Sequence, residues 1–194
     1  MPYDPDSDDP AIKSRPVYHS PAHLPPANDY LCVIEPAARE ILSTLLRQAC
    51  YRRARIVMSS AGAGRETVPT VVDRDVWEEL ARRLDDALET VTVGCRLVVA
   101  GSEGFLWDVQ TFALEKGFVD EEIVLYPVAG QGRRVFCVHC HTLAEPVYVS
   151  PVNCPNCQMA LEVRDHFSRR LGAYIGVRID AEVPSEIPPR EVLS

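Results

Sequence analysis

Two cysteine pairs near the C-terminal end constrain the folding of this chain more than any other feature of its sequence. Cys137 and Cys140 form one Cys-x-x-Cys motif, and Cys154 and Cys157 form a second, separated from the first by 13 residues. The bend of such a motif lets both thiolates face one cation, and two motifs complete a tetrahedron of sulfur ligands. Residues 137–157 are therefore predicted to fold around one metal ion.

The short segment between the motifs is typical of a zinc ribbon, so Zn²⁺ is the expected metal, and residues 145–149 are expected to form a hairpin strand. A mononuclear, rubredoxin-like iron is the alternative, and an iron–sulfur cluster would also be compatible with four thiolates. His139 and His141 flank the first motif. With four cysteines present, these imidazoles are expected to face solvent or to orient the ligands rather than to bind the metal.

No catalytic set of serine, histidine and aspartate, or of cysteine and histidine, follows from the spacing of these residues. A closed four-ligand zinc site also leaves no coordination position for an activated water. Cys32, Cys50 and Cys95 lie in or beside apolar segments and are predicted to be small buried side chains. We therefore expect no catalytic residues in this chain.

Before the cysteine motifs the sequence is typical of an α/β domain. Residues 1–27 are rich in proline and aspartate and are predicted to be disordered or to form an extended arm. From residue 28 to residue 130, short apolar runs alternate with amphipathic segments. The predicted strands are 30–34, 55–58, 95–100 and 122–128, and the predicted helices begin near residues 36, 76 and 105. Strands that are apolar throughout indicate a parallel sheet covered by helices on both faces.

The remaining segments divide at glycines and prolines. Gly130 and Gly132, followed by Arg133 and Arg134, are predicted to form a hinge after the α/β domain. Residues 134–180 are predicted to be the metal-binding module, and residues 181–194 a proline-rich tail. The small-residue run 59–64 is predicted to be a loop, but it does not follow the first strand as a dinucleotide-binding loop would.

Charge and hydropathy exclude two classes of partner. The net charge is −8, and residues 28–130 carry 17 acidic against 11 basic side chains, while residues 131–194 carry 7 of each. Nucleic-acid binding needs basic side chains that displace phosphate counterions, so it is not expected here. No apolar run approaches the roughly 18 residues that would span a membrane, and the acidic start of the chain is unlike a signal peptide. A cytoplasmic location is expected, where thiols stay reduced.

A basic and aromatic segment follows the fourth cysteine closely. Its predicted partner-interface residues are Arg164, His166, Phe167, Arg169, Arg170 and Tyr174. A zinc ion with four thiolate ligands carries a formal charge of −2. The arginines could neutralise this charge, or they could bind an acidic partner surface or an anionic cofactor. The aromatic side chains could contact a partner or pack against the ribbon. Because no adjoining element is expected to supply a pocket wall, we predict a protein partner rather than a small ligand.

Residues 97–106 (LVVAGSEGFL) and 113–123 (ALEKGFVDEEI) resemble the last strand, helix and strand of the pyridine-nucleotide lobe of ferredoxin reductases. That family carries Cys-Gly-Pro where this chain has Ala100-Gly101-Ser102. The cysteine that contacts the nicotinamide is therefore missing. The resemblance implies the fold of that lobe, with weak or no binding of NAD(P)H.

The four cysteines together with residues 164–174 (RDHFSRRLGAY) resemble the small subunit of the dimethylamine monooxygenase family. The resemblance implies a partner subunit of a complex that demethylates secondary amines with O₂ and NADPH. Oxygenase and reductase subunits would then supply the flavin, the iron–sulfur centre and the oxygenase metal, and this chain would assist assembly or relay electrons. Two alternatives are a rubredoxin-like electron carrier and a free-standing nucleotide-binding or regulatory protein with structural zinc.

Overall fold

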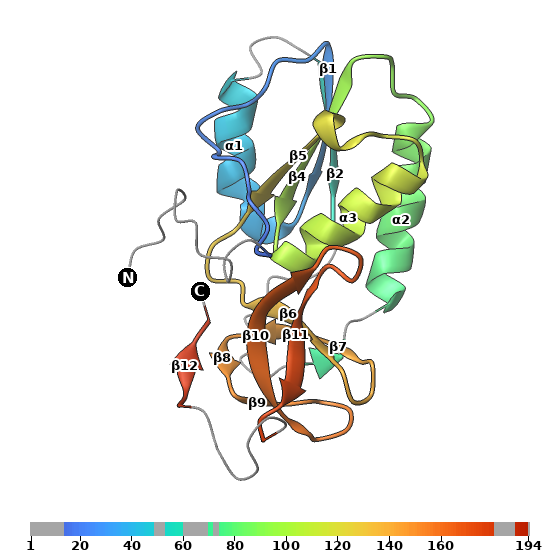
Figure 1. Ribbon diagram of the computed structural model, residues 1–194. Helices are drawn as coiled ribbons and strands as arrows, with labels where there is room; N and C mark the ends of the chain where they lie inside the picture. Colours follow the sequence, from blue (N-terminus) through green and yellow to red (C-terminus); the bar gives the residue numbers. More distant parts are fainter. Residues whose placement is uncertain (1–13, 49–52, 60–69, 72–73, 181–188, 194) are drawn as a thin grey trace.

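The apolar runs of the first half form one parallel sheet. The computed structural model (Figure 1) describes residues 14–48, 53–59, 70–71, 74–180 and 189–193. The sheet consists of β1 (Asp29–Ile34), β2 (Arg53–Met58), β4 (Cys95–Gly101) and β5 (Ile123–Pro127). Their order is β2-β1-β4-β5, and every neighbouring pair is parallel.

Helices cover both faces of this sheet, which confirms the predicted α/β arrangement. The 3-10 turn η1 (Pro36–Ala38) and α1 (Arg39–Gln48) lie on one face, and α2 (Arg74–Leu88) and α3 (Glu103–Glu115) lie on the other (Figure 1). Side chains alternate along a strand, so Leu31 and Val33 pack against α2 and α3 while Cys32 and Ile34 pack against α1. The 3-10 turn η2 (Asp120–Glu122) leads into β5.

A second sheet contains the cysteine motifs. Its strands are β3 (Thr70–Val71), β6 (Arg133–Cys137), β7 (Leu143–Val147), β9 (Val152–Asn153), β10 (Ala160–Ser168) and β11 (Ala173–Arg178), in the order β3-β7-β6-β11-β10-β9. All pairs are antiparallel except β6 with β11. The short strands β8 (Val149–Ser150) and β12 (Glu191–Val192) form a separate pair. Because β3 comes from the first half of the chain, the α/β part also contributes a strand to the second sheet.

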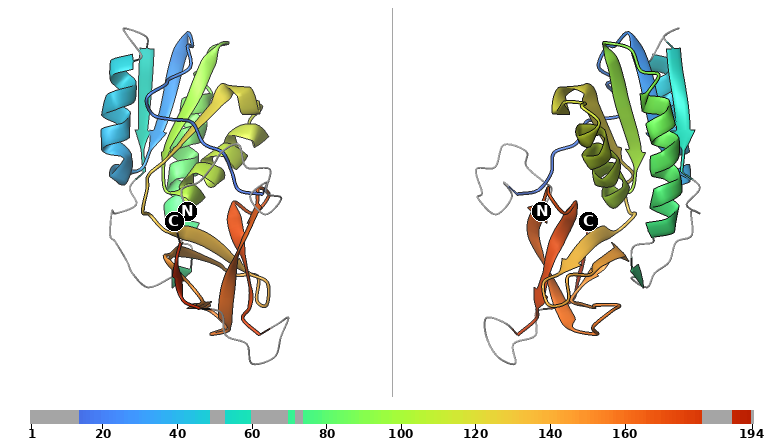
Figure 2. Two further views of the ribbon diagram at one scale, coloured as in Figure 1. Left: turned by 60° about the vertical axis from the view of Figure 1, so that its left-hand side comes forward. Right: turned by 90° about the vertical axis from the view of Figure 1, so that its right-hand side faces the viewer.

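The second sheet lies beyond one end of the parallel sheet and its helices, and the two parts meet at α3 (Figure 2). Trp107 of α3 is buried among Val135, Val163, Phe167 and Tyr174, which belong to β6, β10 and β11. The centroids of the Trp107 and Phe167 rings lie 5.0 Å apart. This apolar contact joins the α/β part to the second sheet.

A buried arginine reinforces the same junction. Arg134 donates two hydrogen bonds to Asp108 of α3, at 2.6 and 2.7 Å, and two to Glu145 of β7, at 2.8 and 2.9 Å. Its side chain is only 3% exposed. Gly104 allows this approach, because a Cβ there would lie 2.2 Å from Glu145 Oε2. We call Arg134, Asp108 and Glu145 the buried clamp.

The buried clamp corrects the predicted hinge. Gly130 and Gly132 do form a turn, with positive φ angles of 74° and 77°. Arg133 and Arg134, however, are the first two residues of β6, and both are buried. Arg134 joins the two parts of the molecule, because its guanidinium is bound by Asp108 of α3 and by Glu145 of β7. Arg133 binds Asp165 of β10, within the second sheet.

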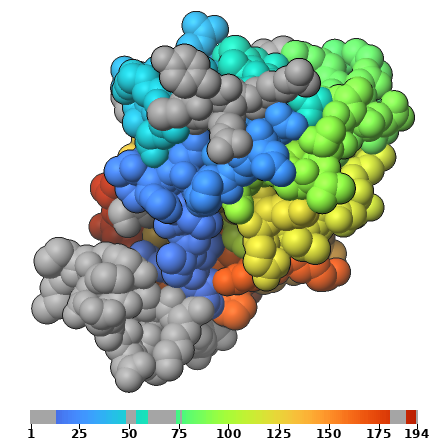
Figure 3. Space-filling view, turned by 90° about the horizontal axis from the view of Figure 1, so that it is seen from above, coloured from blue at the N-terminus to red at the C-terminus, as the bar shows by residue number. Residues whose placement is uncertain are grey.

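Residues 14–27 run as an extended segment along the body of the molecule (Figure 3). Gln48 of α1 holds this segment in the middle: it accepts a hydrogen bond from Leu24 N at 2.9 Å and donates one to Pro21 O at 2.8 Å. At its start, Ser14 and Arg15 bind Asp165 of β10. The segment therefore spans from the helical layer to the second sheet.

Several sequence-based predictions lie wholly or partly outside the described residues, namely Cys50, residues 60–64 of the predicted loop, residues 1–13 of the predicted arm, and residues 181–188 and 194 of the predicted tail. Among the helices that the structure describes, none is long and apolar enough to cross a membrane.

Candidate metal centre

The four predicted ligands converge at one point of the second sheet. Cys137 ends β6 and Cys154 follows β9, so the sheet itself fixes the first cysteine of each motif. The four sulfur atoms lie within 4.8 Å of one another. The Sγ atoms of Cys137 and Cys157 are 3.8 Å apart, and those of Cys140 and Cys154 are 3.6 Å apart. A tetrahedron with metal–sulfur bonds of about 2.3 Å has sulfur–sulfur edges of about 3.8 Å, so the set fits one tetrahedral ion.

The two motifs adopt the same backbone turn. His141 N donates to Cys137 O at 2.8 Å, and Gln158 N donates to Cys154 O at 3.0 Å. Both donor residues have a left-handed φ, 62° for His141 and 61° for Gln158. Non-glycine residues rarely adopt this conformation. The repeated geometry arises because each turn must direct two sulfur atoms to the same point.

A short hydrogen-bonded chain supports Cys140. Asn156 Nδ2 donates to Thr142 Oγ1 at 3.0 Å, and this oxygen lies 3.3 Å from Cys140 Sγ. Once the sulfur is a thiolate it can only accept, so the threonine hydroxyl becomes the donor. The Thr142 hydroxyl lowers the pKa of Cys140 to about 5. Burial has the opposite effect on Cys137, whose pKa it raises to about 12. Metal binding at neutral pH is therefore expected to release a proton from Cys137.

The flanking histidines take no part in this set. His141 is exposed, and its ring stacks on Phe136 with the centroids 5.7 Å apart. His139 is exposed at the tip of the first motif. Among the described residues, the group that could hold a metal consists of the four cysteines alone. Cys32 and Cys95 are buried in the parallel sheet, on opposite faces.

Residues 164–174, the predicted partner interface, form most of a β-hairpin. The segment covers the end of β10, a tight turn and the start of β11. Phe167 and Tyr174 are buried in the junction with Trp107, at 5% and 4% exposure, so they belong to the core of the chain. The turn of this hairpin lies beside α3, at the opposite end of β10 and β11 from the cysteine motifs (Figure 1).

The charged residues of this hairpin differ in their surroundings. Arg164 is half-buried and pairs with Glu162 at 3.3 Å. His166 is exposed, as are Arg169 and Arg170 in the turn. Within the part of the chain that the structure describes, the two turn arginines have no ion-pair partner. They remain candidates for a partner surface, whereas the two aromatic residues do not.

Both parts of the chain match one family of known proteins. The family described as dimethylamine monooxygenase subunit DmmA-like matches in both of its domains, the N-terminal one at residues 10–123 and the C-terminal one at residues 134–177. A relative from Ectopseudomonas mendocina (strain ymp), named heme-dependent oxidative N-demethylase delta subunit, is 34% identical over 171 residues. The alignment covers 88% of this chain and 91% of the relative. The chain belongs to the DmmA-like family. No solved structure matches it.

The membership confirms the resemblance inferred from the sequence. It also shows that the junction residues connect two domains of the family. The boundary between the two DmmA-like domains, residues 123–134, coincides with β5 and the turn that precedes β6. The residues that join the domains of this DmmA-like chain were not predicted in that role: Trp107 and Asp108 were not singled out, and Arg134 was placed in a hinge. Nothing in their local sequence identifies them, since a helical aspartate and an arginine between glycines and a strand are ordinarily exposed.

Proposed function

We propose that this chain is a subunit of a multi-component N-demethylase that oxidatively demethylates a secondary amine, such as dimethylamine, with NAD(P)H and O₂. The observation that carries the proposal is the match to a demethylase delta subunit over nearly the whole of both chains. A cysteine-rich ribbon alone would be common among unrelated proteins. The match here covers the α/β part and the ribbon in the same order, so the shared feature is the whole architecture.

The chain is proposed to assist assembly rather than to hold the catalytic centre. Four sulfurs at tetrahedral spacing would hold Zn²⁺ in a closed site, which contributes folding energy and leaves no position for substrate. The flavin, the iron–sulfur centre and the haem that appears in the relative's name are proposed to reside on partner subunits, including an oxygenase and a reductase. The α/β part is proposed to retain the reductase-like fold as a docking platform, in a cytoplasmic complex.

The second candidate is an electron relay with iron in the same four-cysteine site. The geometry favours it equally, because thiolates bind iron and zinc at similar distances. The metals differ in redox behaviour, since zinc cannot change its oxidation state. Metal analysis of the complex purified from its native host separates the two: one equivalent of zinc supports assembly, and one equivalent of redox-active iron supports relay.

The third candidate, a free-standing nucleotide-binding protein, is disfavoured by a carboxylate at the expected nucleotide site of the parallel sheet. Ligands of open α/β sheets bind where the strand order reverses, which here is between the carboxyl ends of β1 and β4. Glu35, the residue after β1, places its carboxylate there and accepts a hydrogen bond from Ser102 N at 2.5 Å. This carboxylate occupies the start of α3, where a phosphate would otherwise bind.

We therefore expect NADPH to bind the isolated chain weakly, with a Kd no tighter than millimolar, because a nucleotide phosphate would be repelled by Glu35. Isothermal titration calorimetry on the metal-loaded chain checks this. A micromolar site would contradict the expectation and favour the nucleotide-binding alternative.

The turn of the β10–β11 hairpin is the proposed contact with an acidic partner subunit. Reversing both charges, Arg169→Glu with Arg170→Glu, is expected to impair assembly with the oxygenase subunit and to abolish turnover by the complex. Unpaired surface charges set encounter rate and specificity, and reversal adds repulsion. Co-purification and amine-dependent NADPH consumption would measure both effects.

The matched control is Arg39→Glu with Arg47→Glu, which changes the charge equally on exposed positions of α1. This control should assemble and turn over normally. Metal content and far-ultraviolet circular dichroism should be unchanged in both double variants. Normal assembly of the Arg169/Arg170 variant would remove the interface role of the hairpin.

A further inference from the structure

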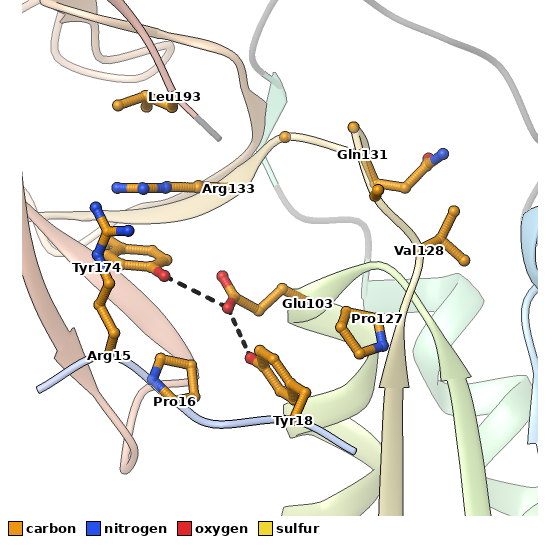
Figure 4. Close-up of a pocket in the computed structure, with 13 residues that line it drawn as sticks. Arg15, Pro16, Tyr18, Glu103, Pro127, Val128, Gln131, Arg133, Tyr174 and Leu193 are labelled. Atoms are coloured by element: carbon orange, nitrogen blue, oxygen red, sulfur yellow. Dashed lines mark hydrogen bonds between the residues drawn. The ribbon is translucent and has the colours of Figure 1, made fainter. Parts of the chain in front are cut away.

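A cavity of about 260 Å³ lies where distant segments of the chain meet (Figure 4). It is lined by residues 15–18, the start of α3, the turn after β5, the start of β11, and Leu193 near the end of the chain. We call residues 14–18, the start of the extended segment, the strap. The prediction that no element near residues 164–174 supplies a pocket wall is wrong, because Tyr174 lines this cavity.

The strap is bound to both parts of the molecule. At one end, Ser14 Oγ donates to Asp165 O of β10 at 2.8 Å, and Arg15 binds the carboxylate of Asp165. At the other end, the Tyr18 hydroxyl donates to Glu103 Oε1 of α3 at 2.6 Å. Between Arg15 and Tyr18 the backbone spans at most about 10 Å. Both ends can therefore stay bound only while α3 and β10 remain close together.

The Tyr18 hydroxyl binds two side chains of α3 at once. It accepts a hydrogen bond from Trp107 Nε1 at 3.0 Å while it donates to Glu103. Trp107 is buried in the apolar junction, and an indole nitrogen can only donate. The Tyr174 hydroxyl of β11 lies 3.5 Å from the same oxygen of Glu103, so two tyrosines from different segments approach one carboxylate (Figure 4). Release of the strap would leave the indole without this acceptor and Glu103 without the closer hydroxyl.

The middle of the strap is weakly packed. Val17, which lies between the two bound ends, is 82% exposed. The residues that follow the strap are held by the α/β part: His23 O accepts from the Tyr126 hydroxyl at 2.8 Å, and Leu24 N donates to Gln48 at 2.9 Å. A surface segment with few apolar contacts can open locally while the core stays folded. The strap can therefore leave the junction without release of the rest of the extended segment.

We propose that the strap is a detachable latch on the domain junction. In the closed state it bridges α3 and β10 and forms one wall of the cavity. In the open state that wall is removed, and solvent reaches the cavity and the side chain of Trp107. Because the strap binds both parts, its release and the loosening of the junction favour each other, as linked equilibria do. The proposal does not depend on the demethylase role.

Chymotrypsin cleavage of the metal-loaded, full-length chain measures release, because the bond after Tyr18 must leave the surface to enter the protease. Tyr18→Phe keeps an aromatic residue for the protease but removes the hydroxyl. Cleavage after residue 18, followed by mass spectrometry, should become about tenfold faster, the factor for a lost hydrogen bond to a charged group. Tyr148→Phe, between β7 and β8 and outside the cavity lining, is the matched control and should be cleaved at the wild-type rate.

Asp165→Asn tests the other end of the strap. It weakens the contact with Arg15 without changing a residue of the strap or of α3. Cleavage after Tyr18 should become about threefold faster, since a partly exposed ion pair contributes less than a buried one. Asp180→Asn, which removes an ion pair with Arg178 at the end of β11, is the control. An unchanged rate for Asp165→Asn would show that β10 does not hold the strap and would refute the latch, even if Tyr18→Phe does not fold.

Fluorescence quenching shows whether release opens the junction. The chain has two tryptophans, so Trp107 is the single reporter in a Trp77→Phe background. Adding Tyr18→Phe should make acrylamide quench Trp107 about twice as effectively, because local opening admits the quencher. Adding Tyr148→Phe should leave quenching unchanged. Faster cleavage of Tyr18→Phe with unchanged quenching would mean that the strap leaves a junction that stays closed, and it would overturn the proposal, as would an unchanged cleavage rate.

Discussion

Cys154→Ser is expected to release the metal and to unfold the C-terminal module. Cys154 is 1% exposed and supplies one of four sulfurs to the tetrahedron. The apolar cluster around the site is small, with Leu161 as the buried residue beside Cys137 and Cys154. In such a module the free energy of metal binding is largely the free energy of folding, about 10–16 kcal/mol for structural zinc. Metal analysis should fall from one equivalent to near zero, and amide exchange should accelerate across β6–β11.

The matched control for this prediction is Cys95→Ser. Cys95 is also a buried thiol, at 4% exposure, but it lies in β4 of the parallel sheet. The control variant should keep one equivalent of metal, even if the added hydroxyl destabilises its surroundings. A full equivalent of metal in Cys154→Ser would contradict the four-cysteine assignment.

Arg134→Met is expected to lower the free energy of unfolding by about 3–5 kcal/mol, the range for breaking a buried ion pair by removing one partner. Methionine has a similar volume but cannot donate hydrogen bonds, so the main change is the loss of the charge that holds Asp108 and Glu145. Burial disfavours the charge of Arg134, yet the two carboxylates raise its pKa above the usual value, so it remains cationic at all working pH values. The two acids are about two-thirds buried or more, and without the guanidinium they would repel each other across the junction.

Urea unfolding of the metal-loaded chain measures this effect. Arg82→Met is the control, because Arg82 pairs with Glu79 and Asp86 on the exposed surface of α2. Exposed pairs contribute little to stability, so its urea midpoint should hardly move. Adding Asp108→Asn and Glu145→Gln to Arg134→Met should restore part of the loss, since the two neighbouring negative charges are then removed as well. A midpoint shift for Arg134→Met no larger than that of the control would show that the clamp contributes little.

The parallel sheet and the metal ligands were predictable because their signals are local. The strand β1 is apolar on both faces, with Leu31 and Val33 on one and Cys32 and Ile34 on the other. A strand needs apolar residues on both faces only when both are covered, so this run indicates a buried parallel strand. The ligands were predictable for a similar reason, since two Cys-x-x-Cys turns specify their own geometry whatever lies around them. The left-handed His141 and Gln158 could not be read from the sequence, because neither residue type indicates a positive φ.

The sequence alone determined which residues form the parallel sheet and which four thiols meet, since each depends on periodicity or spacing over a few residues. How the two parts are joined, and where a cavity forms, depends on the tertiary structure. Arg134 reaches Asp108 and Glu145, which are 26 and 11 residues away, and Glu103 is brought to Tyr18 and Tyr174 from 85 and 71 residues away. Contacts at such separations depend on how whole elements dock, and no local pattern of charge or hydropathy encodes that docking.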